Sequence, residues 1–247
     1  MTALVTGATS GIGRAIAVAL AAEGAPVWAV GRRPEALDAL TAACPSIRGE
    51  RADLVVDDDV ERLVSTLTTE AGGLDGLDGL DVLVHAAGTA VLGCVAAAPI
   101  DALDHMYRLN LRVPYLLTQR LLPLLRRARG QVVFVNSSAG LHASAGASQY
   151  AATKHALKAL ADSLRCEAND DGIRVLSVYP GRTASPMQER LHKQRSLHSL
   201  FRENSRPYVA ADLLQPDDVA AVVVQALRLP RTAEVTDLHV RPFAKPR

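Results

Sequence analysis

The sequence predicts an α/β fold, a doubly wound parallel sheet of about seven strands with helices on both faces. Short apolar, β-branched runs alternate with longer segments of helical pattern. A glycine-rich turn joins the first such run to the first helical segment. The 247 residues, 49% of them hydrophobic, suffice to bury one core. We therefore expect one domain over residues 1–247.

Charge and cysteine usage narrow the class of protein. The formal net charge is +1, which gives no overall attraction to nucleic acid. No apolar run approaches the length of a membrane span, and the chain opens on a strand-like run without a leader pattern. Cys44, Cys94 and Cys166 have neither metal-ligand spacing nor an even number for pairing. We expect a soluble, cytoplasmic protein with no metal and no nucleic-acid or membrane partner.

A strand at residues 3–6 leads through glycines 7, 11 and 13 into a helix at 14–23. Gly7 permits a tight turn, whereas Gly11 and Gly13 let the backbone approach a pyrophosphate at the helix N-terminus. The spacing is G-x-x-x-G-x-G, and a mere glycine-rich connection is the alternative. The residues expected to bind this part of a dinucleotide are Gly7, Thr9, Ser10, Gly11, Ile12 and Gly13.

The second strand, residues 26–30, ends in Gly31, Arg32 and Arg33. An NAD-binding unit usually carries an acid here to accept the ribose hydroxyls. A carboxylate would repel a 2′-phosphate, whereas a guanidinium binds one bidentately. The sequence therefore favours NADP(H) over NAD(H), with Arg32 the stronger candidate. The alternative is that both arginines are solvated loop charges.

The third and fourth strands, 47–52 and 81–85, are each followed by candidate cofactor contacts. Asp53 could accept the adenine amino group, and Leu54 could cover the ring. The small residues after the fourth strand would let a nicotinamide ribose lie against the backbone; they are Ala86, Ala87 and Gly88. Residues 72–81, GGLDGLDGLD, contain too much glycine for a helix and predict a loop.

The stretch SSAGLHASAGASQYAATK at 137–154 follows a predicted strand at 131–136. Tyr150 and Lys154 are four residues apart, so they share one face of a helix. A nearby ammonium lowers the pKa of a phenol, and reaching neutral pH from about 10 takes roughly 4 kcal/mol. Ser137 stands where the strand becomes a loop, a usual place for working residues. The alternative is a solvated pair on a surface helix.

A long helical stretch, residues 100–127, contains Asn110 in an apolar neighbourhood. Pro114 has no N–H for the Asn110 carbonyl one turn back, so we expect a perturbed helix there. Such a perturbation could hold a water for a proton path, and a satisfied structural asparagine is the alternative.

In order and spacing, these pieces resemble the short-chain dehydrogenase/reductase family over nearly the whole chain. The matching pieces are TGATSGIG at 6–13, Asp53-Leu54, HAAG at 85–88, Asn110, Ser137, Tyr150, Lys154 and YPGRTAS at 179–185. The resemblance implies a Rossmann-like sheet and a catalytic set of Asn110, Ser137, Tyr150 and Lys154.

In this family Tyr150 would protonate the carbonyl oxygen, or take the alcohol proton in reverse. Ser137 would hold that oxygen, and Lys154 would lower the phenol pKa and hold the nicotinamide ribose. Asn110 would anchor a water on Lys154. The family's Ser-x-x-Gly pattern selects Ser137, thirteen residues before the tyrosine, with Ser138 as the fallback.

The sequence departs from the family pattern in two places. His85 replaces an asparagine that is mainly said to steady the sheet, and we expect a packed, hydrogen-bonded histidine. The family's Pro-Gly-x-x-x-Thr becomes PGRTAS, in which a serine keeps the hydroxyl that would meet the carboxamide. The cofactor contacts expected in this segment are Pro180, Gly181, Thr183 and Ser185.

A substrate lid is expected at about residues 186–214. It is basic, with Arg190, Lys193, Arg195, Arg202, Arg206, His192 and His198. One interpretation is attraction of an anionic substrate or an acyl carrier. The other is an exposed helical pair whose apolar residues turn inward; these are Met187, Leu191, Leu197, Leu200 and Phe201.

Beyond the lid, the sequence predicts a helix starting at 215–217 and running through 227, and a last strand at 235–240. The helix after Tyr150 is rich in alanine and could pack closely against a symmetry mate. Its alanines are Ala151, Ala152, Ala156 and Ala159. We expect a homodimer or homotetramer.

The resulting hypothesis is an oxidoreductase that transfers a hydride between NADP(H) and a small-molecule carbonyl or secondary alcohol, of the carbonyl reductase (ketoreductase) type. The alternatives are an NAD-dependent alcohol dehydrogenase and a non-catalytic dinucleotide-binding sensor. The Tyr-x-x-x-Lys interval disfavours the family's enoyl reductases, which use a longer one.

Overall fold

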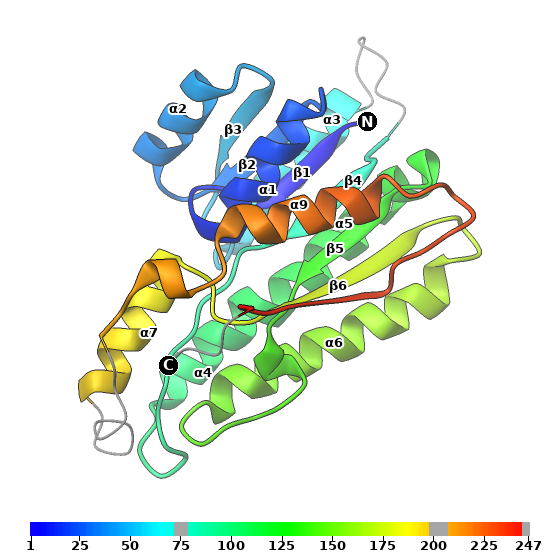
Figure 1. Ribbon diagram of the computed structural model, residues 1–247. Coiled ribbons are helices and arrows are strands. Elements are labelled where there is room, and N and C mark those ends of the chain that lie inside the picture. Colours follow the sequence, from blue (N-terminus) through cyan, green and yellow to red (C-terminus); the bar gives the residue numbers. More distant parts are fainter. Residues whose placement is uncertain (72–78, 198–206, 244–247) are drawn as a thin grey trace.

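The structure is a computed structural model that describes residues 1–71, 79–197 and 207–243. Its centre is a seven-stranded, all-parallel sheet of order β3-β2-β1-β4-β5-β6-β7 (Figure 1). The strands are β1 (Ala3–Thr6), β2 (Val27–Gly31), β3 (Ile47–Arg51), β4 (Val82–His85), β5 (Gln131–Val135), β6 (Arg174–Pro180) and β7 (Asp237–Val240). The predicted fold class is confirmed.

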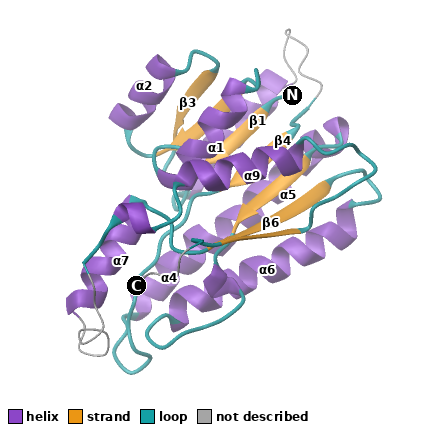
Figure 2. Ribbon diagram, viewed as in Figure 1, coloured by secondary structure: helices purple, strands orange, loops and turns teal. Residues whose placement is uncertain are grey.

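Helices cover both faces of the sheet (Figure 2). One face is covered by α1 (Gly11–Ala22), α2 (Pro34–Ala43) and α9 (Pro216–Leu227). The other is covered by α3 (Asp57–Ala71), α5 (Val113–Ala128) and α6 (Ser148–Ala168), and α4 (Ile100–Tyr107) leads into α5. A further helix, α7 (Pro186–Leu197), stands beyond the carboxyl ends of the strands.

Alternation along the strands divides the interior into two cores. In β1, Ala3 and Val5 pack towards α1 and α9, whereas Leu4 packs towards α5 and α6. All three side chains are fully buried, as strands covered on both faces require. This double burial explains why the strands appear in the sequence as continuous apolar runs.

The predicted perturbation at Asn110 is confirmed. Residues Arg108–Arg112 form a π-helical turn between α4 and α5, and the N–H of Val113 reaches back to the Arg108 carbonyl. Pro114 follows at once and supplies no N–H for the ladder. The turn therefore inserts Asn110, fully buried, into the interior.

Element ends differ from the sequence-based expectation by a few residues. The first helix begins at Gly11 because Ser10, in extended conformation, is its N-cap. The fifth strand ends at Val135 rather than 136, and the last begins at Asp237 rather than 235. Most of the predicted loop at 72–81 lies outside the described residues.

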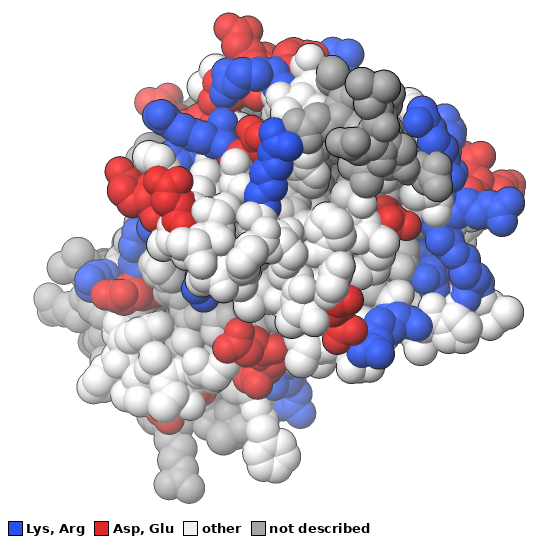
Figure 3. All heavy atoms as spheres, turned by 90° about the horizontal axis from the view of Figure 1, so that it is seen from above, with Lys and Arg blue, Asp and Glu red and all other residues white. Residues whose placement is uncertain are grey.

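Charges on the surface are mixed. On the face drawn in Figure 3, acidic and basic side chains are interspersed around a largely uncharged centre. Within the described ranges, no helix is both long and apolar enough to cross a membrane.

Candidate functional site

A cleft of about 510 Å³ runs along the carboxyl ends of the strands. With the exception of Asn110, every predicted catalytic or cofactor-binding residue lines it. The structure therefore brings together segments from the first helix to the loop after β6. The carboxyl edge of a parallel sheet is the expected place for a ligand, beside the point where the strand order reverses between β1 and β4.

The glycine turn is packed too closely for side chains. Gly7 has φ +67°, and a Cβ there would lie 2.7 Å from the Ala87 backbone. A Cβ on Gly13 would lie 2.5 Å from the Gly7 carbonyl oxygen. The start of α1 therefore reaches the cleft as bare backbone, with N–H groups that lack intrahelical acceptors. This is an arrangement that binds anions.

The two arginines after β2 differ in their hydrogen bonding. Arg33 donates from Nη2 to the Thr9 carbonyl at 3.1 Å and to the Thr9 hydroxyl at 3.2 Å, which ties it to the glycine turn. Arg32 lines the cleft and makes no hydrogen bond or ion pair to a described residue. Gly31 leaves room for Thr9, whose methyl group a Cβ would strike. Arg32 is thus the guanidinium available to a ligand.

Asp53 and Leu54 lie after β3, where the sequence places them. The Asp53 N–H donates to the Asp59 carboxylate at 2.7 Å, and one Asp53 oxygen accepts from Val55 at 3.3 Å. Leu54 is buried and borders the cleft. Local hydrogen bonds fix the Asp53 carboxylate, and its remaining oxygen lone pairs can accept from a ligand.

Residues 86–88, which follow β4, form one wall of the cleft, and the hydroxyl of Thr6 holds this wall to β1. Thr6 Oγ1 accepts from the N–H groups of Ala86 and Ala87 at 3.1 and 3.2 Å and donates to the Val84 carbonyl. A Cβ on Gly88 would lie 3.3 Å from Asn110 Oδ1 and 3.9 Å from Lys154 Nζ. The lysine therefore sits directly behind this wall.

His85 is packed and hydrogen-bonded, as expected. Its Nε2 lies 2.9 Å from the Thr118 hydroxyl of α5, and its ring stacks on Phe134 at 5.0 Å. Burial lowers the pKa of His85 to about 3, so the imidazole is neutral at physiological pH. His85, which stands where the family has an asparagine, therefore links β4 to α5.

Tyr150 and Lys154 face the cleft from the first two turns of α6. Lys154 is 4% exposed, and its ammonium donates to the Val135 carbonyl at 2.9 Å. Burial lowers the pKa of Lys154 to about 8. The pKa of Tyr150 is raised by burial, against an opposing hydrogen bond with Ser137. The expected lowering of the phenol pKa is therefore wrong for this structure, because desolvation outweighs the hydrogen bond with Ser137.

Ser137 rather than Ser138 contacts the tyrosine. Its hydroxyl accepts from the Ala139 N–H at 3.1 Å, which starts the 3₁₀ turn Ser138–Gly140. Ser138 also borders the cleft. The preference for Ser137 agrees with this geometry.

Asn110 does not line the cleft. Its amide accepts from the Thr89 N–H at 2.8 Å and donates to the Thr89 carbonyl and the Thr153 hydroxyl at 2.9 and 3.0 Å. The side chain therefore joins the wall after β4 to α6. This supports the structural alternative for the asparagine side chain.

Sequence reasoning missed Asn136, which it assigned to the end of a strand. Its amide donates to the Lys154 carbonyl at 3.1 Å and accepts from the Ser137 N–H at 2.9 Å. A Cβ on Gly140 would strike this amide, so the glycine makes room for it. Asn136 thus connects the strand that carries Ser137 to the helix that carries Tyr150. An asparagine directly before the serine was the only available signal.

The segment after β6 forms a further wall of the cleft and reaches back to the glycine turn, where a Cβ on Gly11 would lie 3.3 Å from the Cβ of Ser185. Thr183 is buried, and its hydroxyl donates to the Gly181 carbonyl at 3.1 Å. The Ser185 hydroxyl accepts from the Gln188 N–H at 3.2 Å and so caps α7. Met187 and Leu191 line the cleft from α7. The predicted positions from 198 to 206, with Leu200, Phe201, Arg202, Arg206 and His198, lie outside the described residues, as does the side chain of Leu197.

The alanine surface of α6 needs one correction. Ala151 is 2% exposed and packs inside the chain, so it cannot meet a symmetry mate. The helical period turns Ala152 and Ala159 outward instead. Of the four alanines expected at a contact with a second copy, these two and the half-buried Ala156 are accessible.

Comparison with known proteins identifies the class to which this fold and cleft belong. A model of the family described as short chain dehydrogenase matches residues 1–196. An uncharacterized short-chain type dehydrogenase/reductase of Sinorhizobium fredii is 35% identical over 97% of this chain and 90% of its own. The chain belongs to the short-chain dehydrogenase/reductase family and is an oxidoreductase of that family.

Two solved structures illustrate the relationship. A short-chain dehydrogenase from Streptomyces avermitilis is 30% identical, with a TM-score of 0.82, over 97% of this chain and 87% of that one. A variant of actinorhodin polyketide ketoreductase with NADPH is 27% identical, with a TM-score of 0.83, over 98% and 95%.

Proposed function

We propose that this protein interconverts a carbonyl compound and its secondary alcohol with NADP(H), and that Tyr150 is the proton donor or acceptor. The observation that carries the proposal is that Ser137, Tyr150 and Lys154 line the same cleft as the bare glycine turn. A proton donor is thereby placed beside a dinucleotide-sized groove. The substrate lid at about 186–214, of which α7 is the described part, belongs to the same proposal.

The cleft fits a dinucleotide by its own geometry. Any side chain on Gly7 or Gly13 would strike backbone, so this surface is kept open for a ligand to approach closely. The N-terminus of α1 offers N–H donors to phosphates, and Asp53 and Leu54 border the region expected to hold the adenine. When bound, the nicotinamide supplies or accepts the hydride.

The preference for NADP(H) rests on Arg32. It follows β2 where an NAD-binding unit usually has an acid, and it has no partner among the described residues. The actinorhodin ketoreductase structure contains NADPH. Exchanging Arg32 for Asp should raise the KM for NADPH about 10- to 100-fold and leave that for NADH nearly unchanged. Arg127→Asp, on an exposed face of α5, is the matched control, and equal effects on the two cofactors would refute the preference.

Proton transfer follows from the environment of Tyr150. Its raised pKa keeps the phenol protonated at neutral pH, which suits donation to the carbonyl oxygen as hydride reaches the carbonyl carbon. The Ser137 hydroxyl, in hydrogen-bond contact with the phenol, is placed to hold the same oxygen. Lys154, mostly protonated at pH 7, lies against the wall where the ribose is expected.

The first test is NADPH consumption with ketones, quinones, steroids and β-ketoacyl thioesters, in parallel with Tyr150→Phe. We expect turnover on one class and a loss of at least about 100-fold in the variant. Tyr107→Phe, on an exposed part of α4, is the control. NADPH binding without any turnover would favour the sensor alternative, and equal or better use of NADH would favour an NAD-dependent alcohol dehydrogenase.

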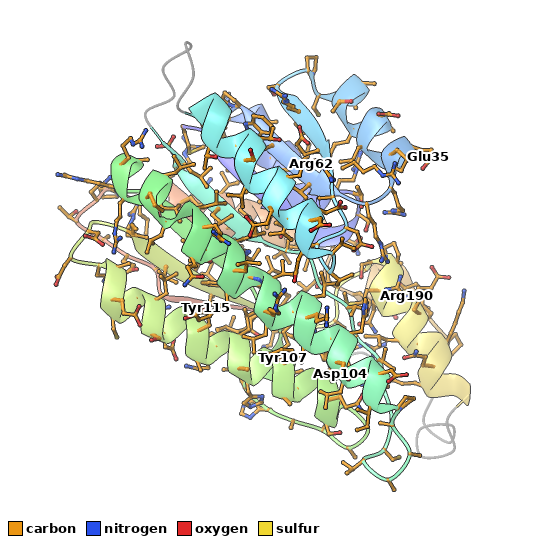
Figure 4. The ribbon with its side chains drawn as sticks, turned by 180° about the vertical axis from the view of Figure 1, so that it is seen from behind. Glu35, Arg62, Asp104, Tyr107, Tyr115 and Arg190 are labelled. Carbon is orange, nitrogen blue, oxygen red and sulfur yellow. The ribbon has the colours of Figure 1, made fainter. Side chains whose placement is uncertain are left out.

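A homodimer or homotetramer is part of the proposal. Tyr107 and Tyr115 are 50% and 55% exposed on α4 and α5, on the face that Figure 4 presents with α6. Exposed aromatic side chains beside the outward alanines of α6 are typical of a surface that packs against a second copy. Light scattering on the eluting protein measures its mass, and a monomer would contradict this part.

A further inference from the structure

The first two turns of α6 are connected to the rest of the chain by two buried side chains. On the side of β5, the Asn136 amide donates to the Lys154 carbonyl. On the side of the π-helical turn, Thr153 donates from its hydroxyl to the Tyr150 carbonyl at 2.9 Å and is bonded to Asn110. Tyr150 and Lys154 are the residues through which α6 lines the cleft. Their positions therefore depend on both connections.

The direction of each hydrogen bond at Thr153 follows from one backbone group. The Thr89 N–H can only donate, so the Asn110 atom 2.8 Å from it is the amide oxygen. The amide nitrogen then faces the Thr89 carbonyl at 2.9 Å and the Thr153 hydroxyl at 3.0 Å. An amide NH2 group cannot accept, so the Thr153 oxygen accepts from it and the hydroxyl hydrogen serves the Tyr150 carbonyl. One chain of hydrogen bonds therefore runs from the end of the wall after β4 to the backbone of Tyr150.

This chain of hydrogen bonds is shielded from solvent. Asn110 is 0% exposed and Thr153 is 3% exposed. Both hydrogens of the Asn110 amide nitrogen have acceptors, and so does the hydroxyl hydrogen of Thr153. Without that hydroxyl, a buried amide N–H would lose its acceptor, which is costly because no water replaces the partner. The hydroxyl of Thr153, rather than its methyl group, makes the connection.

The amide of Asn110 lies where the wall after β4 meets the lysine of α6. In Figures 1 and 4, α4 and the start of α5 lie beside α6. A Cβ on Gly88 would lie 3.3 Å from Asn110 Oδ1 and 3.9 Å from Lys154 Nζ, so these groups meet at one point behind the wall. A shift of the Asn110 amide would therefore change the space between the wall and the lysine ammonium.

We propose that Thr153 is a positioning residue, whose hydroxyl fixes the Asn110 amide against the Tyr150 backbone and so sets the wall after β4 relative to Tyr150 and Lys154. The inference rests on the proposed function, in which this wall holds the nicotinamide ribose and Tyr150 moves the proton. Thr153 acts through its neighbours, since its hydroxyl is bonded to Asn110 and to the Tyr150 carbonyl. A displacement of about 1 Å between reacting groups can lower a rate about 100-fold.

Three substitutions separate the hydroxyl of Thr153 from its methyl group. Thr153→Ser keeps the hydroxyl, Thr153→Val keeps the shape without the hydroxyl, and Thr153→Ala loses both and repeats the test should the valine variant fail to fold. We expect kcat to fall about 5- to 20-fold in the valine and alanine variants and to stay within about twofold of the parent in the serine variant. The KM for NADPH should change less than about twofold throughout, because the phosphates are expected at the glycine turn. An active valine variant with an impaired serine variant would indicate packing and overturn the inference.

Hydrogen exchange at the Thr89 N–H tests the connection without any turnover. This N–H donates to Asn110, so its exchange in the cofactor-free protein should become about 10-fold faster in Thr153→Val and Thr153→Ala. Thr153→Ser should leave the exchange rate unchanged. The amides of β5, inside the sheet, report any general loss of stability. Equal acceleration at β5 and at Thr89, or none at Thr89, would overturn the inference.

Thr41→Val, on α2, is the matched control. The Thr41 hydroxyl also donates to a carbonyl three residues back in its helix, that of Asp38, at 3.0 Å. This helix covers the other face of the sheet. The control should change neither kcat nor exchange at Thr89.

The outcomes separate this inference from the proposed function. If the parent protein consumed NADPH with no carbonyl compound, the proposed reaction would be contradicted, and exchange at Thr89 would still decide the role of Thr153. If the parent turned over a carbonyl compound and Thr153→Val kept the parental kcat, the reaction would stand and the positioning role would be overturned. A lower kcat with faster Thr89 exchange in Thr153→Val, both restored in Thr153→Ser, would support both.

Discussion

One end of the cleft is lined by backbone groups and the other by long side chains. At the end formed by β1 and β2, the surface is backbone: Gly7 in a left-handed conformation and Gly13 against a carbonyl. At the end formed by β6 and α7, the surface consists of long side chains, which include Arg182, Arg190 and Arg195. Backbone positions tolerate almost no change, whereas side chains can be exchanged singly. Under the proposed function, the backbone end would bind the cofactor and the side-chain end would select the substrate.

The largest effect should come from His85, which is buried at the end of β4 beneath the segment that joins the two ends of the cleft. The pKa of His85 is lowered to about 3 in the folded protein, so between pH 6.5 and 3 only the unfolded chain binds the proton. Stability therefore falls as pH falls, by about 3 kcal/mol between pH 7 and pH 4. His85→Asn should remove this dependence, measured by urea unfolding at both pH values.

His155→Asn, on an exposed face of α6, provides the control and should leave the pH dependence as it is in the parent. If the stability of His85→Asn still fell as much at low pH, the fall would arise from protonation of carboxylates and not from the buried neutral imidazole.

The next effect tests the backbone end. Gly7→Ala combines a left-handed φ with a Cβ 2.7 Å from the Ala87 backbone. We expect a loss of about 2 to 4 kcal/mol in the free energy of unfolding and of most NADPH affinity. Gly24→Ala has φ +82° and open space around its Cβ, so it isolates the cost of the conformation, about 1 kcal/mol. Thermal and urea unfolding measure both losses. If Gly7→Ala lost no more stability than Gly24→Ala, close packing at the turn would be unimportant.

The junction of strand and helix comes third. Asn136→Ala leaves the Ser137 N–H and the Lys154 carbonyl without their buried partner. A loss of about 1 to 3 kcal/mol is expected, together with a lower kcat and an unchanged KM for NADPH. Asn169→Ala removes an exposed amide whose hydrogen bond to a described side chain is with Glu234, and it should cost less than about 0.5 kcal/mol. A rise in KM alone would show that Asn136 serves cofactor binding rather than the position of Ser137.

The smallest effect concerns Arg33, whose side chain is hydrogen-bonded to the glycine turn. Arg33 donates to Thr9 from an exposed position, so Arg33→Ala should raise the KM for NADPH only about two- to fivefold. Arg32→Ala should have the larger effect, because Arg32 has no other described partner. Initial rates at varied NADPH would rank the two, and the reverse ranking would make Arg33 the phosphate ligand.

Much of the site could be predicted because it depends on local order. Strand, glycine turn and helix are adjacent in sequence, so Gly7 to Gly13 could be assigned from their spacing alone. The four-residue interval likewise placed Tyr150 and Lys154 on one face of α6. The roles of Asn136 and Asn110 could not be read in this way, because their partners at Lys154 and Thr153 are 18 and 43 residues distant.

The sequence by itself determined the fold class, the family and most of the residues that meet in the cleft, because apolar periodicity and glycine spacing act within a few turns of chain. Only the tertiary structure decided the protonation of the site. Desolvation raises the pKa of Tyr150 and lowers that of Lys154, and desolvation depends on what every other segment packs against the helix. It also decided that the Nε atom of Arg182 is buried without an acceptor among the described residues, and that Arg182 lies near Arg195, since that meeting joins a strand end to a separate helix.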